Sequence, residues 1–315
     1  MKSERKQIIF LSLILFFISI FKITFGEWDI PLSEVIYFLF HEGTSPEAIV
    51  IRSVRLPRLL CCAGTGGLLS VAGAVLQGLL ANPLAEPYTL GIASGAAFGA
   101  ALGIMAGAFM IMPMAFAGAL SALFLTGLIA AGGKEKIILA GVISNSILSA
   151  GVTFIKSIAG DKLGAVVLWL MGSFSGAGVK DVYSVYAGAV LIFIPAYIFA
   201  PALDAMSLGQ DRAAVLGINE KFTRIILLIF TSTGVALAVS SFGIIGFVGL
   251  AVPHISRNLI GASHRKIIFH SFLTGACILS IADCAAQLLG ELPVGVLTAL
   301  TGGLFFCRIL SKRHY

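Results

Sequence analysis

The sequence predicts an all-α protein that crosses a membrane about ten times. Only 11% of its 315 residues are charged and 58% are hydrophobic, whereas soluble domains carry roughly 25% charged residues. Residues 87–133 contain no Asp, Glu, Lys or Arg, and this stretch is long enough for two spans of about 20 residues. A soluble fold of this size needs far more polar surface, so the composition excludes one.

Apolar stretches separated by charged or turn-forming residues place the spans along the chain. The first follows the basic start MKSERK, and we expect it to be retained because no small-x-small cleavage site precedes Gly26. Lys22, near its end, is expected to reach the interface with its ammonium group. The charge-free stretch divides near Met112 and Pro113. The expected spans are residues 7–25, 59–80, 89–108, 113–131, 137–155, 183–200, 222–240, 244–260, 267–289 and 294–310.

The eighth of these spans is the least regular. Residues 225–256 are free of charged side chains, but the stretch is longer than one span and short for two. Its turn signal is Ser240-Ser241-Phe242-Gly243, and Pro253 follows inside the next apolar run. We therefore expect the eighth helix to be short or broken.

The basic residues predict the orientation. The net charge of +6 indicates topology first, because Lys and Arg gather on the cytoplasmic side of membrane proteins, and we expect no nucleic-acid partner. With both termini inside, fourteen of the 21 basic residues are cytoplasmic. An odd number of spans would instead place the basic C-terminal KRHY outside. The fourteen are Lys2, Arg5, Lys6, Lys134, Lys136, Arg212, Lys221, Arg224, Arg257, Arg265, Lys266, Arg308, Lys312 and Arg313.

Glycine distinguishes the third span from the first. The first span is built from bulky Ile, Leu and Phe, which is typical of a helix that faces lipid. The third carries a glycine at every fourth position, which lets a second helix approach closely along its length, although a pore lined by bare backbone would show the same pattern. These glycines are Gly91, Gly95, Gly99, Gly103 and Gly107.

The chain lacks the motifs of a membrane enzyme. HExxH, GxSG and GxxxxGK[ST] are all missing, so any ATP must be bound by another polypeptide. Its five cysteines lie in apolar runs without metal-ligand spacing, and we predict neither a disulfide framework nor a metal site. Asp283 is the one clear carboxylate within a span. Such a residue is costly and by default functional, so hydrogen bonding between helices and gating or proton coupling both stay open.

Two extramembrane segments carry the remaining signals. Residues 26–58 form an expected external loop that ends in IRSVRLPRLL, so Arg52, Arg55 and Arg58 lie on the side where positive charge is disfavoured. They either anchor lipid headgroups or dock an acidic partner, since Arg binds carboxylates in a bidentate manner.

The second segment is the cytoplasmic stretch 203–219, LDAMSLGQDRAAVLGIN. It has an apolar side and a polar side, and two glycines are expected to end or cap its helices. Such a segment could lie on the membrane or dock into a soluble partner. Its apolar side is Leu208, Ala213 and Leu216, its polar side is Gln210, Asp211 and Arg212, and its glycines are Gly209 and Gly217.

Longer motifs show a family resemblance. They are RLPRLL (55–60), GGLLSVAGAVLQGLLANPLAEPYTLGIASGAAFGA (66–100), LWLMGSF (168–174), residues 203–219, GIIGFVGLAVPHISRNLIGASHRK (243–266) and GACILSIADCAAQLLGELPVGVLTALTGGLFFCRIL (275–310). In this order and spacing the chain resembles the FecCD-type permeases of ABC importers, which serve iron-siderophores, haem and vitamin B12. The resemblance covers residues 50–312, while the first 50 match only in character.

The resemblance implies a type II importer permease. It implies one transmembrane domain over residues 1–315 with ten helices and both termini cytoplasmic, in the bacterial cytoplasmic membrane. The partners it implies are a second permease subunit, identical or homologous, two ATPases that bind MgATP, and an extracytoplasmic binding protein. Residues 203–219 would be the coupling segment for the ATPases, and Arg55 and Arg58 would meet glutamates of the binding protein.

The expected function is therefore import of a ferric-siderophore or similar iron complex. The chain itself is expected to be no enzyme and to bind no cofactor. Two alternatives remain: a haem or corrinoid importer of the same class, and a proton-coupled secondary carrier that uses Asp283.

Overall fold

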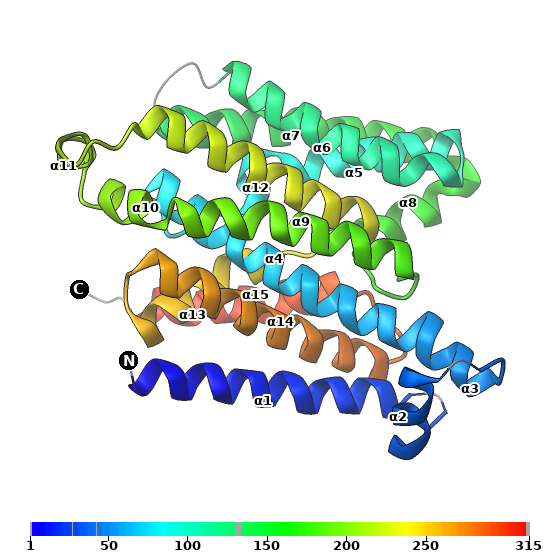
Figure 1. Ribbon diagram of the computed structural model, residues 1–315. Coiled ribbons are helices and arrows are strands. Elements are labelled where there is room, and N and C mark those ends of the chain that lie inside the picture. Colours follow the sequence, from blue (N-terminus) through cyan, green and yellow to red (C-terminus); the bar gives the residue numbers. More distant parts are fainter. Residues whose placement is uncertain (1, 27, 42, 130–133, 313–315) are drawn as a thin grey trace.

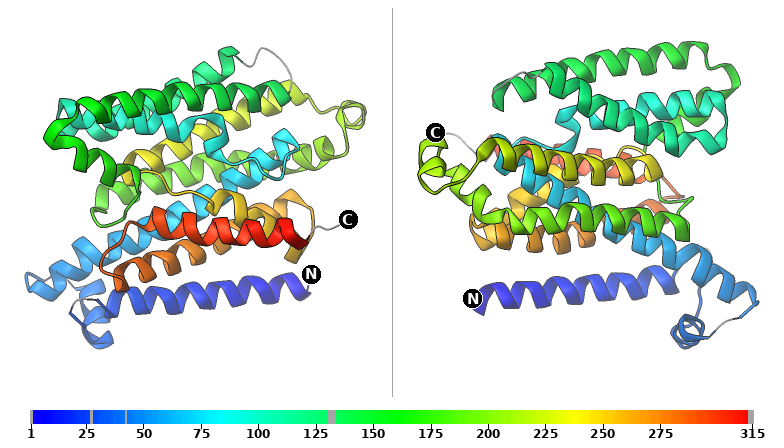
Figure 2. Two further views of the ribbon diagram at one scale, coloured as in Figure 1. Left: turned by 180° about the vertical axis from the view of Figure 1, so that it is seen from behind. Right: turned by 45° about the horizontal axis from the view of Figure 1, so that its top comes forward.

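The computed structural model describes residues 2–26, 28–41, 43–129 and 134–312, and within these ranges the chain forms helices and no strands. The helices run roughly along one common direction, with α1 at one edge of the bundle and α7 at the opposite edge (Figures 1 and 2). We call the end where α1 begins and α15 ends the N-terminal end, and the opposite end, which carries α2, the α2 end.

Seven helices in the described part of the chain are long and apolar enough to cross a membrane. Three shorter helices complete the set, so that each of the ten expected spans overlaps one helix of the structure. The long helices are α1 (Lys2–Thr24), α4 (Leu56–Leu80), α6 (Ile111–Ile129), α7 (Lys134–Ile158), α9 (Val179–Ile198), α12 (Glu220–Phe242) and α14 (His264–Leu288). The shorter ones are α5 (Ile92–Ala106), α13 (Val248–Ile260) and α15 (Val294–Lys312).

Helix α4 runs through the middle of the bundle and buries almost every side chain (Figure 1). Glycines let its neighbours touch its backbone. A Cβ on Gly66 would collide with the carbonyl oxygen of Gly275 on α14, and one on Gly73 would collide with that of Gly249 on α13. Close backbone packing of this kind is how membrane helices gain contact without a hydrophobic driving force.

The glycine stripe of α5 faces α6. A Cβ on Gly95 would collide with the carbonyl oxygen of Gly118, and one on Gly99 with that of Met114. A Cβ on Gly103 would lie 2.7 Å from the Cα of Ile111. Gly91 and Gly107 flank the helix with φ of 82° and 144°. The stripe therefore packs two helices together and does not line a pore in this chain.

The chain between α12 and α13 is extended where the sequence predicted a break. Gly243 ends α12 with φ of 72°, and α13 resumes at Val248 for 13 residues with Pro253 inside. The hydroxyl of Tyr88 accepts from the backbone N–H of Ile245 (2.9 Å) and donates to its carbonyl oxygen (2.6 Å). Backbone at membrane depth needs such partners, because no water is there to supply them.

Much of the expected external loop is helical. It contains α2 (Leu32–Phe40), α3 (Pro46–Ile49) and a π-helical turn, η1 (Val50–Arg55), which joins α3 to α4 in one helical stretch of 35 residues. The Ser45 hydroxyl caps α3 by accepting from the Ala48 N–H at 3.2 Å. Ile51 packs there with Ile23 and Val35, so tertiary contacts keep this polar segment helical.

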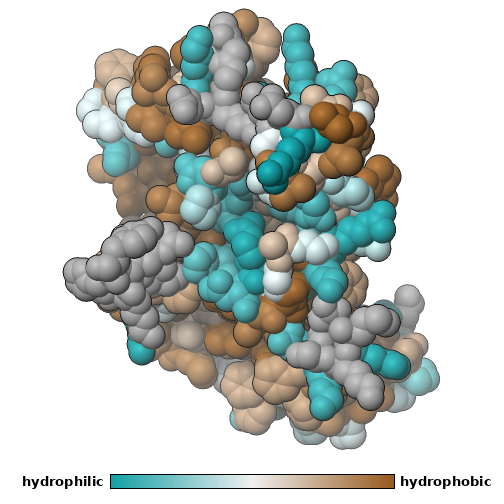
Figure 3. Space-filling model, turned by 90° about the vertical axis from the view of Figure 1, so that its left-hand side faces the viewer, coloured by the Kyte–Doolittle hydropathy of each residue, from teal (hydrophilic) through white to brown (hydrophobic). Residues whose placement is uncertain are grey.

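The lateral surface of the bundle is apolar. On α1, Phe10, Phe16 and Phe17 are exposed, in agreement with a helix that faces lipid. The N-terminal end looks different: hydrophilic residues gather across its middle and hydrophobic ones flank them (Figure 3). This division is typical of a protein whose sides contact lipid and whose ends contact water.

Candidate functional site

At the α2 end, the intramembrane carboxylate lies in a buried cluster of charges. Asp283 of α14 is 1% exposed and accepts two hydrogen bonds from Arg58 of α4, Nε to Oδ2 at 3.0 Å and Nη2 to Oδ1 at 3.1 Å. The Lys22 ammonium of α1 donates to the same carboxylate. Arg58 Nη1 also lies 2.8 Å from Oε2 of Glu291, in the turn between α14 and α15. We call these four residues the charge cluster.

The cluster is electrically balanced, with two cations and two carboxylates. Balance matters because an unpaired charge away from water costs several kcal/mol, whereas a fully paired set is tolerated. Lys22 is only 4% exposed, so the expectation that it reaches the membrane interface is wrong. An ion pair with a buried carboxylate holds it inside, and that carboxylate lies 261 residues away in the sequence.

Glu291 is held in an unusual conformation. Its φ is 58°, directly after Gly290 with φ of 89°, and its side chain is half exposed while it covers the guanidinium of Arg58. Non-glycine residues in the left-handed region cost of order 1–3 kcal/mol and persist where surrounding contacts hold them. Sequence reasoning did not single out Glu291, although the Gly290-Glu291 turn marks where α14 must end.

The three arginines expected to dock a partner are placed differently from one another. Arg58 does not face outward: it is 7% exposed and bound within the charge cluster. Arg55 donates to the carbonyl oxygens of Ile23 (2.7 Å) and Thr24 (2.9 Å) at the end of α1. Arg52 is half-buried on η1. Arg55 therefore ties η1 to the end of α1, Arg58 ties α4 to α14, and docking of a partner stays a prediction for all three.

At the N-terminal end, residues 203–219 form a compact projection. α10 (Ala200–Ser207) and α11 (Gln210–Val215) meet at Gly209, and Gly217 follows α11. Their φ values are 108° and 75°, which side-chain-bearing residues rarely adopt, so both glycines set the path of the backbone. The projection lies beyond the ends of α9 and α12 (Figure 1).

Apolar side chains cover the outside of this projection. Leu208 and Leu216 are more than half exposed and Val215 is 88% exposed, whereas Ala213 points into the fold and is buried. Arg212 is exposed. The side chains of Gln210 and Asp211 lie outside what the structure describes. Val215 was missed by the sequence analysis, which assigned the apolar side from Leu208, Ala213 and Leu216.

A polar contact joins this projection to the bundle. Asp204 of α10 accepts from the backbone N–H of His264 at 2.9 Å, and its Oδ1 lies 2.6 Å from His264 Nδ1. This carboxylate therefore caps the first turn of α14. His264 is itself buried against Gly78 near the end of α4. The projection is thus tied to the two helices that carry Asp283 and Arg58 at their opposite ends.

No cluster of metal-ligating residues exists among the described residues. The five cysteines are free thiols, and three of them, Cys61, Cys62 and Cys277, are buried among apolar residues.

Comparison with known proteins decides the family. The family model for the FecCD transport family matches residues 11–312. The chain belongs to the FecCD transport family. It is 38% identical to an ABC transporter permease, YvrB, of Bacillus subtilis, over 93% of this chain and 89% of that protein. It is 34% identical to the Fe(3+) dicitrate permease FecD of Escherichia coli (84% and 85% covered) and 35% identical to the hemin permease HmuU of Yersinia pestis (83% of each).

A solved structure shares the whole fold. It is an ABC transporter of the metal-chelate type in an inward-facing conformation, and it superposes with a TM-score of 0.89 at 30% identity, over 98% of this chain and 99% of that one. This FecCD chain is therefore a multi-pass permease of the cytoplasmic membrane, a transport subunit without catalytic activity of its own. Its family works with an ATPase and a binding protein as partners.

Proposed function

We propose that this FecCD permease imports a ferric-siderophore or similar iron complex, with the N-terminal end in the cytoplasm and the α2 end outside. We further propose that ten helices cross the membrane and that the chain pairs with a second permease subunit and two ATPases. The observation that carries it is the glycine-bounded projection at residues 203–219, because a FecCD chain contains no nucleotide site and must receive its motion through such a surface.

The projection is suited to docking into an ATPase. Its exposed apolar side chains, Leu208, Val215 and Leu216, would otherwise face water, and a protein groove would bury them. ATP binding drives transport only if the ATPase binds one permease conformation better than the other. Closure of an ATPase pair would therefore displace the two projections and the helices attached to them.

The bond between Asp204 and His264 supplies a path for that displacement. Through it, a movement of α10 reaches α14, in addition to α9 and α12, which continue directly from the projection. Tilting of these helices would open the pathway to each side in turn, as in alternating access by rigid bodies.

The binding protein is proposed to dock at the α2 end, near Arg52 and Arg55. Arg52→Glu is expected to abolish uptake while the permease still assembles with its ATPase. Uptake that is unchanged in this variant would refute the docking surface. Arg55 and Arg58 are unsuitable for the same test, since Arg55 holds the end of α1 and the loss of Arg58 would unbalance the charge cluster.

Cysteine crosslinking tests the coupling proposal directly. Single cysteines at positions 208, 212 and 215 are expected to crosslink to the ATPase, and a cysteine at the lipid-facing position 17 serves as the control. Crosslinks to neither the ATPase nor any soluble partner, together with labelling by lipid-phase reagents only, would show that the segment lies on the membrane.

The cargo is tested with the binding protein. Reconstituted vesicles that contain the permease, its ATPase and its binding protein are offered an iron-loaded siderophore, haem or cobalamin. Uptake of haem or cobalamin alone would favour the second candidate, which the hemin relative supports. Uptake that continues without ATP and collapses a proton gradient would favour a secondary carrier. The pairing of Asp283 with Lys22 and Arg58 argues against that alternative.

A further inference from the structure

Helix α2 exposes an apolar stripe at its end of the bundle. Leu32, Ile36 and Phe40 follow one another at every fourth position, so they lie on one face of the helix. Their side chains are 45%, 51% and 80% exposed. A neighbouring face is fixed inside the protein, where Val35 packs with Ile23. The fold therefore holds the stripe in place, and the described part of the chain leaves it uncovered.

The polar side of the same helix faces α3. Ser33, Glu34 and Tyr37 line a pocket together with Ser45 and Glu47, which lie at the start of α3. This helix lies farther from the N-terminal end of the bundle than α2 does (Figures 1 and 2). The polar side of α2 therefore turns toward the water beyond the bundle.

The apolar stripe turns the other way. Ile36 lies nearly opposite Glu34 on the helix, because two residues correspond to about 200° of rotation. The stripe consequently faces away from α3 and back toward the level of the membrane-crossing helices. In Figures 1 and 2, α2 lies at the same edge of the bundle as α1, whose exposed side chains are apolar.

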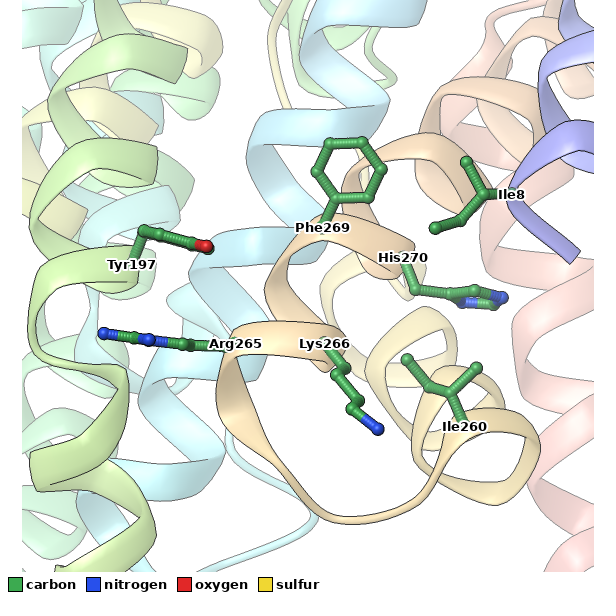
Figure 4. Close-up of a pocket in the computed structure, with 7 residues that line it drawn as sticks. All are labelled: Ile8, Tyr197, Ile260, Arg265, Lys266, Phe269 and His270. Atoms are coloured by element: carbon green, nitrogen blue, oxygen red, sulfur yellow. The ribbon is translucent and has the colours of Figure 1, made fainter. Parts of the chain in front are cut away.

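The opposite end of α1 locates the bilayer along the bundle. Ile8 of α1 lines a pocket with Arg265 and Lys266, which occupy the first turn of α14 and point to opposite sides of it (Figure 4). Basic residues at a helix end are typical of the headgroup level. From Ile8 to Thr24, where α1 ends, the helix extends about 24 Å, whereas the hydrocarbon core of a bilayer is about 30 Å thick. The hydrocarbon layer therefore reaches just past the end of α1.

Helix α2 begins at that level. The backbone N–H of Ile30 donates to the carbonyl oxygen of Thr24 at 3.0 Å, so the start of α2 lies beside the end of α1. Phe25 and Trp28 are exposed in the connection between the two helices. Trp is enriched at membrane–water interfaces, where its apolar ring and polar N–H both find suitable surroundings. The lipid-facing surface of α1 thus continues through this connection to the stripe of α2.

A soluble binding protein is the competing occupant of the stripe. It would approach the bundle from the water beyond α3, on the side that the pocket around Glu34 faces. The stripe faces away from that side and carries no charged residue that could select a protein partner. The bilayer is therefore the occupant that the geometry favours.

We propose that α2 is an interfacial helix whose stripe, Leu32, Ile36 and Phe40, inserts into the outer leaflet at the boundary between headgroups and acyl chains. Helices of this kind bury one apolar face in the lipid and keep their polar face in water. The choice of leaflet rests on the proposed function, which places the α2 end outside, whereas the insertion rests on the stripe and its position beside α1. The lipid thus supports the segment that connects α1 to η1 and α4.

Tryptophan fluorescence in reconstituted vesicles tests the insertion. A single tryptophan is placed at position 36, in the stripe, or at position 33, on the polar side, in a full-length chain that carries Trp28→Phe and Trp169→Phe. We expect phosphatidylcholine that is brominated on its acyl chains to quench the Ile36→Trp variant about twofold or more strongly than the Ser33→Trp variant. Iodide in the water is expected to show the reverse order.

Two results would overturn the proposal. One is equal quenching of the two variants by both reagents. The other is iodide quenching at position 36 that disappears only when the binding protein is added, since the stripe would then belong to a docking surface. Iodide that reaches position 33 only from the side of the ATPase would refute the orientation in the proposed function, while lipid quenching at position 36 would still support insertion.

A measurement on the wild type guards against variants that fail to fold. A phospholipid with a photoreactive group on its acyl chain is expected to label Ile36 and Phe40, as well as Phe17 on the exposed face of α1. The buried Ile51 serves as the negative control and is expected to remain unlabelled. Labelling of Phe17 without labelling of Ile36 or Phe40 would show that the stripe lies outside the bilayer.

Discussion

The two ends of the molecule differ in where they place charged and apolar side chains. At the α2 end, four charged residues are gathered at and near the protein interior and pair with one another, whereas at the N-terminal end the apolar Leu208, Val215 and Leu216 project outward. A buried ion pair loses its energy when its geometry changes, so it suits a junction that stays fixed. An exposed apolar surface on a glycine-bounded segment gains energy only when a partner covers it. On the proposed function, the α2 end is therefore the fixed end of the molecule and the N-terminal end is the driven end.

The largest effect is expected from removing the centre of the fixed end. Asp283→Leu leaves Lys22 buried without its carboxylate and Arg58 with the half-exposed Glu291 as its remaining partner, and we expect a loss of about 3–5 kcal/mol in the free energy of unfolding. Chemical unfolding in detergent measures it. Asp161→Asn, which removes an exposed carboxylate, is the control. A loss of less than about 1 kcal/mol would show that water or lipid headgroups compensate the cluster.

The next effect concerns the driven end. Gly209→Val forces a β-branched residue into a φ of 108°, and we expect uptake to fall by about tenfold or more while ATP hydrolysis continues or the ATPase dissociates. Gly164→Val is the control, because its surroundings are open and its φ is not positive. Normal uptake by the Gly209 variant would show that the segment needs no fixed shape.

The link between the driven end and α14 should have a smaller effect. Asp204→Ala removes a cap and its bond to His264, each of which contributes about 1 kcal/mol. We expect the number of ATP molecules hydrolysed per imported substrate to rise several-fold, with the amount of permease in the membrane unchanged. An unchanged ratio would mean that α9 and α12 carry the motion alone.

The smallest effect is expected at Glu291, where two substitutions distinguish backbone strain from the charge of the side chain. Both Glu291→Gly and Glu291→Ala remove the exposed partner of Arg58, but only glycine adopts a φ of 58° without cost. We expect the glycine variant to be more stable than the alanine variant by about 1 kcal/mol. Thermal unfolding of the pair measures this difference. Equal stabilities would indicate that the turn relaxes once the carboxylate is gone.

The two ends also differ in how much of them the sequence revealed. The driven end is continuous in the chain, so alternation of apolar residues, polar residues and glycines within residues 203–219 predicted both its glycine breaks and its exposed Leu208 and Leu216. The exception is Ala213, which turns inward because α11 packs that face against the core. The fixed end is assembled from residues 22, 58, 283 and 291, and no local pattern connects them.

The same distinction holds for the fold. Hydropathy located every long helix, because a span of about 20 apolar residues is a local property of the chain. It also predicted the short α13 after Gly243. Hydropathy did not predict that α3, η1 and α4 form one helical stretch, because three arginines within eight residues indicate a segment outside the membrane. Packing of Ile51 on Ile23 and Val35 overrides that local signal.

By itself, the sequence determined the all-helical membrane fold and the family, and it singled out residues 203–219 as the segment proposed to meet the ATPase, because composition, helix length and motif spacing are local properties of the chain. Only the tertiary structure decided that Lys22 stays inside, that Arg58 binds Asp283 and that Arg55 closes the end of α1. The physical reason is that a charge in an apolar protein takes the state its neighbours allow. Those neighbours lie far along the chain, 261 residues away for Lys22, 225 for Arg58, and 31 and 32 for Arg55.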